Sequence, residues 1–372
     1  MTDGGGGLAS PDPAARARAV LGRCAAHGFA LAGIAEARPS SHAESFRAWI
    51  AAGKQGAMAY LAQELERRLD PRALVPGAAS VLCVADRYSD GRPDRRVPWE
   101  GSVARYARGE DYHEVIRARL ESLAEELRRA HPGERFRVCV DTAPLLEREH
   151  AERAGLGRVG KHTLLIGAGG AGTWLLLGCL VSTLPLAAVR ADGLPPGAAA
   201  NDPCGACTAC IDACPTGAIR PWSVDGRTCI SALTIEQPGP IPGELAARMS
   251  GWLFGCDLCQ EACPHSQPTR RSRALGIHEA YRPHLPAQLP LAEVLGWTAA
   301  DLERMRFNAV LRRADLSMWR RNAALAAHGA LRSPEVPPDV RAALREALLK
   351  VAADRSAAPE ARSAASWAVG SS

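Results

Sequence analysis

The sequence predicts a fold in three parts: an α/β domain, a cysteine-rich segment and a helical C-terminal region. Apolar, strand-like runs alternate with amphipathic helical patterns over residues 13–190. Eight cysteines crowd into residues 204–263, and short helical patterns rich in Arg, Ala and Leu follow residue 268. We therefore expect a disordered tail over 1–12, the α/β domain over 13–190, the cysteine-rich segment over 191–268 and the helical region over 269–372.

In the α/β part, Pro13 opens a helix that ends at Gly28, and FALAGIA follows as a short buried strand. The Asp70-Pro71 pair stops another helix. The other elements are predicted as helices over 42–53, 58–69, 109–130 and 145–155, and as strands over 80–88, 136–143, 163–166 and 173–186.

The stretch GAGGAG matches the pattern G-x-G-x-x-G through Gly167, Gly169 and Gly172. A nucleotide-binding fingerprint needs a helix directly after it, whose N-terminus receives the pyrophosphate. Here the strand-like run TWLLLG follows instead. We therefore interpret the glycines as a hairpin turn.

The cysteine-rich segment opens with C-x2-C-x2-C-x3-C-P and closes with C-x2-C-x3-C-P, with one further cysteine between the runs. In the first spacing three thiolates hold one iron–sulfur cluster and the fourth reaches a second cluster. A disulfide framework suits small secreted chains better, and zinc sites rarely use such runs. The segment therefore predicts a ferredoxin-like domain with two 4Fe–4S clusters, held by Cys204, Cys207, Cys210, Cys214, Cys229, Cys256, Cys259 and Cys263. Between the two runs, residues 244–255 are predicted as a helix.

The C-terminal region resembles a short HEAT-type stack of helix pairs, which offers a concave binding surface. From Arg270 to the end the chain holds 16 Lys and Arg residues against 10 Asp and Glu residues. A positive excess of this kind favours a polyanionic partner, although an Arg-rich composition or a solvated helix face explains it equally well. The arginines considered as phosphate contacts are Arg270, Arg271, Arg273, Arg312, Arg313, Arg320 and Arg321.

The rest of the composition is that of an ordinary globular protein, with 47% hydrophobic and 23% charged residues. The N-terminus has no apolar core of the kind found in signal peptides, and no apolar run reaches the length of a membrane span. We expect a cytoplasmic protein without membrane contact, which agrees with thiolates kept reduced for metal. Four further cysteines are expected in the core: Cys24, Cys83, Cys139 and Cys179.

Two stretches of the α/β part are dense in polar residues: YARGEDYH (106–113) and VDTAPLLEREHAERAGLGRVGKHTLLI (140–166). Asp141 stands directly after the strand FRVCV, at the end where open α/β sheets place their ligands. It can equally be the cap of a helix that begins near Pro144. The residues alone leave both interpretations open.

These two stretches, the order of the eight cysteines, CISALTIEQPG (229–239) and GCDLCQEACP (255–264) together resemble the epoxyqueuosine reductase family. The resemblance covers nearly the whole chain. It implies an enzyme that reduces epoxyqueuosine at the wobble position of tRNA to queuosine, the last step of queuosine synthesis. It also implies two 4Fe–4S clusters and cobalamin, the latter held with the substrate by residues 13–190.

The resemblance implies that Cys204, Cys207, Cys210 and Cys263 hold one cluster, and that Cys214, Cys229, Cys256 and Cys259 hold the other. A cluster would reduce cob(II)alamin to cob(I)alamin, which attacks or reduces the epoxide carbon, while Asp141 donates a proton to the leaving oxygen. For that role we expect burial to raise the pKa of Asp141.

Candidate contacts to cobalamin or to the modified base are Tyr106, Asp111, Tyr112, Lys161, Thr163 and the segment from Ser231 to Gln237. His162 stands where the family more often has Asn. We expect it to be a partly exposed loop residue, with a cofactor contact as the alternative. The expected partners are a tRNA with a GUN anticodon, met by the helical region over 269–372, and an external low-potential electron donor. We expect the protein to be a monomer.

Two other functions were weighed: a corrinoid iron–sulfur reductase of a small molecule, similar to a reductive dehalogenase, and a ferredoxin-like electron carrier with a helical interaction scaffold. The first class typically carries a twin-Arg export signal, which the N-terminus lacks. The second would bind no cobalamin.

Overall fold

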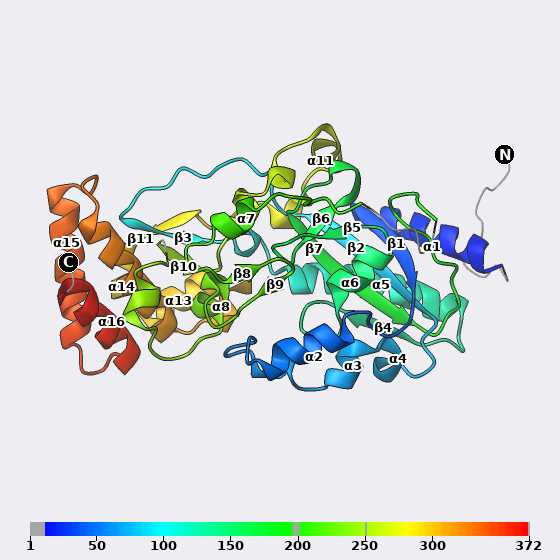
Figure 1. Ribbon diagram of the computed structural model, residues 1–372, viewed down its shortest axis with the longest axis horizontal. Coiled ribbons are helices and arrows are strands. Elements are labelled where there is room, and N and C mark those ends of the chain that lie inside the picture. The colour runs from blue at the N-terminus through cyan, green and yellow to red at the C-terminus, as the bar shows by residue number, and fades with distance from the viewer. Residues whose placement is uncertain (1–11, 196–200, 250, 371–372) are drawn as a thin grey trace.

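The computed structural model describes residues 12–195, 201–249 and 251–370. The molecule is elongated, with α1 (Pro13–Ala26) at one end and α15 (Pro338–Ala353) and α16 (Pro359–Gly370) at the other (Figure 1). The cysteine-rich segment lies between these ends. No helix of the described residues is both long and apolar enough to cross a membrane.

The predicted tail over 1–12 lies outside the described residues except for Asp12. The Asp12 side chain accepts hydrogen bonds from the backbone N–H groups of Ala14 and Ala15 and so caps α1. Residues 196–200 of the predicted linker also lie outside the described part.

The α/β part contains a four-stranded antiparallel sheet in the order β1-β2-β7-β4. Its strands are β1 (Leu31–Glu36), β2 (Ser80–Arg87), β7 (Leu175–Ser182) and β4 (Phe136–Cys139). Leu82 and Val84 of β2 pack against α1 and α5 (Tyr112–Ala130), whereas Val81 and Cys83 face α6 (Glu147–Arg153). This alternation covers both faces of the sheet with helices.

The predicted strands of this sheet are confirmed, as is the burial of Cys24, Cys83, Cys139 and Cys179. The antiparallel order corrects one expectation. The rule that ligands gather at the carboxyl ends of strands applies to open parallel sheets. The position of Asp141 therefore needs another explanation.

The predicted helix over 58–69 is interrupted. After α2 (Ala43–Ala51) the chain forms only η1 (Ala59–Leu61) and α3 (Leu65–Leu69). Glu64 adopts φ 48°, a left-handed conformation that cannot continue a right-handed helix. The Asp70-Pro71 stop is confirmed, since Asp70 caps the next helix, α4 (Pro71–Leu74).

The GAGGAG stretch is a turn, as predicted. The backbone N–H of Gly167 donates to the carbonyl of Gly172 at 2.7 Å, and β7 follows rather than a helix. Gly169 and Gly172 have φ values of 62° and 91°, which glycine adopts without strain. The turn follows the hairpin of β5 (Gly157–Val159) and β6 (Leu165–Gly167) and contains η3 (Ala168–Gly170).

A second sheet joins all three predicted parts of the chain in the order β10-β3-β11. Its strands are β3 (Glu100–Val103), β10 (Trp252–Phe254) and β11 (Gln288–Pro290). The predicted helix over 244–255 is wrong: among the residues that the structure describes there, only α9 (Gly243–Ala246) is helical, and WLF forms β10. Gly251 and Gly255, with φ 75° and 69°, bound this short buried strand. The three segments are therefore interleaved rather than separate, and the boundaries at 190 and 268 stay predictions.

The cysteine-rich segment is built from short elements. The two helices that follow the CxxC runs, α7 (Ala209–Asp212) and α10 (Leu258–Glu261), pack against each other. This places the first and the second cysteine run side by side. The remaining elements are β8 (Ile219–Arg220), β9 (Ser223–Val224), α8 (Ile230–Ile235) and η4 (Pro264–Ser266).

The C-terminal region is largely helical, as predicted. Its long central helix α14 packs against α12, α15, α16 and β10. The elements before α15 are α11 (Arg270–Leu275), η5 (Glu279–Tyr281), α12 (Leu291–Gly296), α13 (Ala299–Arg306), η6 (Val310–Arg313) and α14 (Leu316–Arg332). The HEAT-type character of this stack stays a prediction.

Candidate functional site

Asp141 lies in the loop between β4 and α6, with φ 53°. Its Oδ2 is 3.2 Å from Nε2 of His113, and 61% of its side chain is exposed. The capping alternative is wrong, because α6 begins at Glu147 after Leu146, and no side chain caps it. A non-glycine residue in a left-handed conformation is uncommon outside functional or strained sites.

His113 lies between two carboxylates. Its Nδ1 is 2.8 Å from Oδ1 of Asp111, which also accepts the backbone N–H of His113 and so caps α5. Burial lowers the pKa of His113, but the hydrogen bonds and negative charges of Asp111 and Asp141 outweigh it. The net effect raises the pKa of His113 to about 9, so the imidazole is protonated at neutral pH.

The pKa of Asp141 is lowered, not raised as expected. Burial raises it, but the hydrogen bond and charge of His113 and the charges of Arg148 and Arg313 outweigh that effect. The neighbouring carboxyl of Glu147 behaves oppositely. It accepts the backbone N–H of Asp141 at 2.6 Å, and burial together with the charge of Asp141 raises the pKa of Glu147 to about 8.

A wall of aromatic side chains connects this group to the cysteine-rich segment. Tyr112 stacks on His113 with ring centroids 4.0 Å apart, and Tyr106 meets Tyr112 edge-on at 6.2 Å. The ring of Tyr106 also packs against that of Phe254, with ring centroids 6.4 Å apart. Tyr106 and Cys256 pack against the same apolar cluster. Tyr106 therefore bridges from Asp141 toward the second cysteine run.

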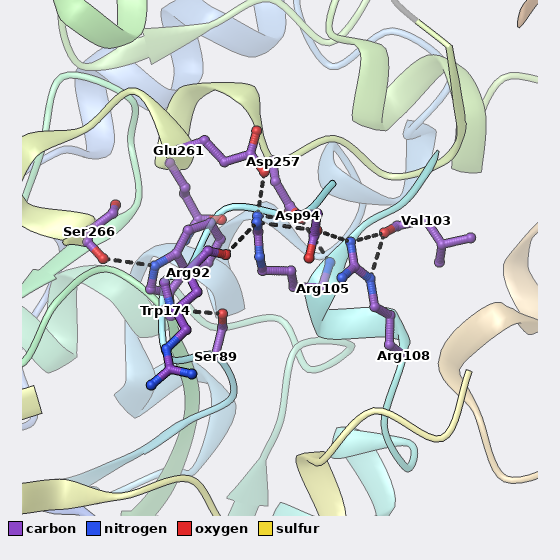
Figure 2. A network of polar contacts seen from close by, with 12 residues as sticks. Ser89, Arg92, Asp94, Val103, Arg105, Arg108, Trp174, Asp257, Glu261 and Ser266 are labelled. Atoms are coloured by element: carbon purple, nitrogen blue, oxygen red, sulfur yellow. Dashed lines mark hydrogen bonds and ion pairs between the residues drawn. The ribbon is translucent and has the colours of Figure 1, made fainter. Parts of the chain in front are cut away.

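A buried polar network connects the segment just before Tyr106 to the loop that carries Cys256 (Figure 2). The Arg105 side chain is only 5% exposed and bonds Asp257 at 3.4 Å, Glu261 at 2.5 Å and Asp94 at 3.2 Å. Its backbone N–H donates to Asp257 at 2.8 Å. Arg108 bonds Asp94 at 2.7 Å and the carbonyl of Val103, so η2 (Arg105–Ala107) is fixed on both sides.

The eight cysteines fall into two groups by their mutual charge effects. Burial raises the pKa of the Cys210 thiol, and Cys263, Cys204 and Cys207 raise it further. Burial likewise raises the pKa of Cys259, with Cys229 the strongest cysteine neighbour. Cys256 is influenced by Cys259 and Cys229, and Cys229 by Cys214.

These neighbours divide as the two predicted ligand sets do, and the sets stay a prediction. Cys210 of the first set also acts on Cys259 of the second, so the two groups adjoin. Cys207 of the first group is exposed while Cys210 and Cys263 are buried, and all four cysteines of the second group are half-buried. No three His, Cys, Asp or Glu side chains of the described residues converge as they do around a single metal ion.

Lys161 lies at the first cysteine group, and His162 follows it in the chain. The ammonium of Lys161 donates to the carbonyls of Gly205 and Cys207, at 2.7 and 2.9 Å. His162 is 2% exposed, so the expectation of a partly exposed loop residue is wrong. Burial, with the charges of Arg148 and His265, lowers the pKa of His162 to about 4.

The remaining predicted residues are Thr163, Ser231 and Gln237, and each contacts a different part of the site. Thr163 accepts the Arg148 guanidinium through its carbonyl at 2.7 Å, and Arg148 in turn acts on Asp141. Ser231 donates its backbone N–H to Cys229. The carbonyl of Gln237 accepts from Arg321 at 2.6 Å.

Arg321 is fully buried and also donates to the carbonyls of Leu233 and Gly239. Arg320 donates to the carbonyl of Trp297. Arg321 therefore supports the loop after α8 and is not a phosphate contact, which corrects one expectation for the basic helices. Arg270, Arg271, Arg273, Arg312 and Arg313 are exposed.

Sequence reasoning missed Arg68. Its side chain is 7% exposed, and its Nε has no hydrogen-bond partner among the described residues. Burial lowers the pKa of Arg68, while the charges of Glu147, Tyr60 and Asp141 oppose that effect. No sequence pattern marks this residue, because only the fold brings α3 to the loop of Asp141.

The fold and this site define a class: an iron–sulfur oxidoreductase. In this class the protonated His113 and its partner Asp141 are separated from two groups of four cysteines by aromatic side chains. Two family models match the chain, "Epoxyqueuosine reductase QueG, DUF1730" over residues 68–142 and "4Fe-4S double cluster binding domain" over residues 203–266.

Curated relatives match over most of their length. The epoxyqueuosine reductase of Xanthomonas campestris is 38% identical over 88% of this chain and 91% of its own. That of Pseudomonas aeruginosa is 37% identical over 86% of each chain, and that of Escherichia coli 36% over 80% and 77%. The chain belongs to the epoxyqueuosine reductase family.

Solved structures agree. A crystal structure of epoxyqueuosine reductase with an epoxyqueuosine-modified tRNA-Tyr stem loop has a TM-score of 0.80 at 25% identity, covering 95% of this chain and 89% of that one. A selenomethionine-labelled epoxyqueuosine reductase, at 23% identity and a TM-score of 0.75, shows the same fold over 95% of this chain and 98% of that one.

Proposed function

We propose that this chain reduces epoxyqueuosine at the wobble position of a tRNA with a GUN anticodon to queuosine. The observation that carries the proposal is the Asp141–His113 pair, connected through Tyr112 and Tyr106 to the second cysteine group. Converting an epoxide to an alkene takes two electrons and two protons and releases water. A site for this reaction must therefore receive electrons on one side and protons on the other.

The electrons enter through two 4Fe–4S clusters. In this proposal Cys204, Cys207, Cys210 and Cys263 hold the outer cluster, and Cys214, Cys229, Cys256 and Cys259 hold the inner one. The exposure of Cys207 supports an outer cluster open to an external low-potential donor. Lys161 stabilises the outer loop through its bonds to Gly205 and Cys207, rather than contacting the substrate.

The residues around Asp141 also fit cobalamin, which when bound supplies the nucleophilic cobalt needed to open the epoxide ring. Arg68 supports this fit, because a buried guanidinium nitrogen without a partner is costly and the corrin rim carries amide acceptors. Tyr106, Tyr112, Thr163, Ser231 and Gln237 are the other candidate contacts to the cofactor or the modified base. The protein's part is to bind and orient both molecules.

Asp141 and His113 handle the proton. At neutral pH His113 carries it, one hydrogen bond from Asp141 Oδ2, and the exposed Asp141 carboxyl faces outward to a substrate. Because Asp141 is ionised, it first takes the proton of His113 through their hydrogen bond and then passes it to the epoxide oxygen. The second proton of the released water enters from solvent through the exposed Asp141 carboxyl. Asp111 holds the ring of His113 in the orientation that this transfer needs. Asp111 is therefore assigned as a positioning residue.

Asp141→Asn tests this assignment, because Asn tolerates the left-handed conformation of Asp141 but donates no acidic proton. The variant, loaded anaerobically with both clusters and cobalamin, should bind both cofactors and lose about 100- to 10,000-fold in turnover. Nucleoside mass spectrometry of epoxyqueuosine tRNA measures the conversion. Asp90→Asn, at an exposed aspartate, serves as the control.

Full turnover by Asp141→Asn would remove the proton-donor role. A wild-type protein that binds cobalamin but leaves epoxyqueuosine tRNA unchanged would favour a small-molecule reductase. A protein that binds both clusters but no cobalamin would favour an electron carrier.

A further inference from the structure

Phe307 is the most exposed large apolar side chain of the described residues, at 80%. A single exposed apolar residue is ordinary on a protein surface, so exposure alone assigns no function. The position of Phe307 is what distinguishes it. It lies directly after α13, at the beginning of the loop that contacts the group around Asp141.

The backbone holds this loop firmly against the site. The carbonyl of Asn308 accepts the backbone N–H of Asp111 at 3.1 Å, and Asn308 adopts φ 55°. Ala309 and Leu311, just beyond, are buried. Phe307 therefore directly precedes Asn308, the residue whose carbonyl binds Asp111, and Asp111 orients His113.

A second exposed aromatic residue and two arginines border the same site. Tyr60 is 39% exposed, and the Arg313 guanidinium lies over its ring at 4.8 Å. Arg313 also bonds Glu236 at 2.9 Å, and its charge acts on Asp141, while the charge of Arg312 acts on Asp111. Exposed aromatic rings combined with arginines are the usual means of binding single-stranded nucleic acid.

A wobble base that reaches Asp141 must leave the stack of its anticodon loop. Its neighbour in the loop then loses a stacking partner, and an aromatic side chain can replace it. We propose that Phe307 stacks on an unpaired base of the anticodon loop next to the modified nucleotide. Arg312 and Arg313 meet the adjoining phosphates. This inference rests on the proposed tRNA substrate and adds a base contact beside it.

The test is binding of an epoxyqueuosine anticodon stem loop to the protein loaded with clusters and cobalamin, measured by fluorescence anisotropy at several salt concentrations. Phe307→Ala should weaken binding about 5- to 100-fold, the usual loss for one stacked base. Phe307→Trp should bind as wild type, because its ring also stacks. Phe307→Leu should bind as weakly as Phe307→Ala, because it is apolar but has no ring.

The salt dependence separates stacking from charge. Phe307→Ala should leave the slope of log K against log salt unchanged, whereas Arg312→Gln should reduce it by about one phosphate contact. Leu349→Ala, at another exposed apolar residue far along on α15, is the matched control and should bind as wild type.

Wild-type affinity in Phe307→Ala would overturn the proposal, and so would wild-type affinity in Phe307→Leu, which would indicate simple apolar contact. Both outcomes are read only alongside conversion by the wild-type protein. If the wild type converts the stem loop, a null effect of Phe307→Ala rejects the stacking contact alone. If the wild type neither binds nor converts it, the proposed function itself fails.

Discussion

At the scale of single residues, the surroundings of Asp141, His113 and Glu147 determine which of the three carries a proton at neutral pH. His113 is protonated at neutral pH, Asp141 is ionised, and Glu147 is largely neutral, with its pKa raised to about 8 by burial and by the charge of Asp141. Pairs of titratable groups with pKa values pushed apart are typical of acid–base sites. The sequence predicted Asp141 alone as the proton donor, whereas in the structure the protons are carried by its neighbours His113 and Glu147.

The raised pKa of His113 makes the folding stability depend on pH. An unfolded imidazole has a pKa of about 6.5, and the folded value is about 9. Its pairing with Asp111 and Asp141 therefore stabilises the folded protein fully below pH 6.5, and this stabilisation is lost as the pH rises through about 9. His113→Gln should melt at a lower temperature than wild type at pH 6, and the difference should shrink by pH 9.5.

Thermal unfolding followed by tryptophan fluorescence under anaerobic conditions measures this difference. His42→Gln, at an exposed histidine at the start of α2, is the control and should show no pH-dependent gap. A gap of constant size from pH 6 to 9.5 would contradict the raised pKa of His113.

A site residue could be predicted from the sequence where a local motif marks it. It could not where only contacts with residues distant in the chain bring it to the site. Asp141 was found through its motif, although the sheet rule used to support it does not apply to an antiparallel sheet. Lys161 and His162 share that motif, but the Lys161 side chain contacts the cysteine loop, 40 or more residues away in the chain. The burial of His162 likewise follows from the fold. Arg68 and Tyr60 reach the site only through folding, so no local pattern marks them.

At the scale of elements, η2 is the junction between the polar site and the inner cysteine group. Arg105, the first residue of η2, bonds Asp257 and Glu261 of the cysteine loop (Figure 2). Tyr106 follows directly in the chain. Because Asp257 is 1% exposed, its carboxylate depends on Arg105 for charge compensation. The orientation of Tyr106 and the placement of Cys256 are therefore set by one network.

Arg105→Met should destabilise the protein by about 3–5 kcal/mol, because it leaves a buried carboxylate without its partner. It should also release iron from the inner cluster faster than wild type, since Asp257 lies between Cys256 and Leu258. Chemical denaturation and the decay of the cluster absorbance measure the two effects. Arg92→Met is the matched control, because its side chain is 84% exposed. Equal stability of both variants would contradict this role.

The sequence predicted most helices and strands of the molecule but not how they combine. Long periodic segments such as α5 and α14 were located correctly, because their apolar positions repeat along the chain. The strand β10 was missed, because three buried apolar residues after a helical pattern carry no period. Only its pairing with β3, about 150 residues earlier, makes it a strand.

At the scale of the whole molecule, the two cysteine groups form one path from the surface to the site. The outer group includes the exposed Cys207, and the inner group includes Cys256, which packs against the same apolar cluster as Tyr106. Cys210 of the outer group acts on Cys259 of the inner group, so the groups adjoin. In the proposed function, an electron that enters at the outer cluster crosses the inner one to reach the residues around Asp141.

Cys229 tests this path, because it is separated from both cysteine runs in the sequence yet lies at the inner group. Cys229→Ala should retain the outer cluster, lose the inner one and so hold about half the wild-type iron. Its conversion of epoxyqueuosine tRNA should fall to background, since the outer cluster alone does not contact the aromatic wall. Cys24→Ala, at a buried cysteine on the core face of α1, should keep all the iron. Unchanged iron in Cys229→Ala would remove this residue from the ligands, and undiminished conversion despite the iron loss would show that electrons bypass the inner cluster.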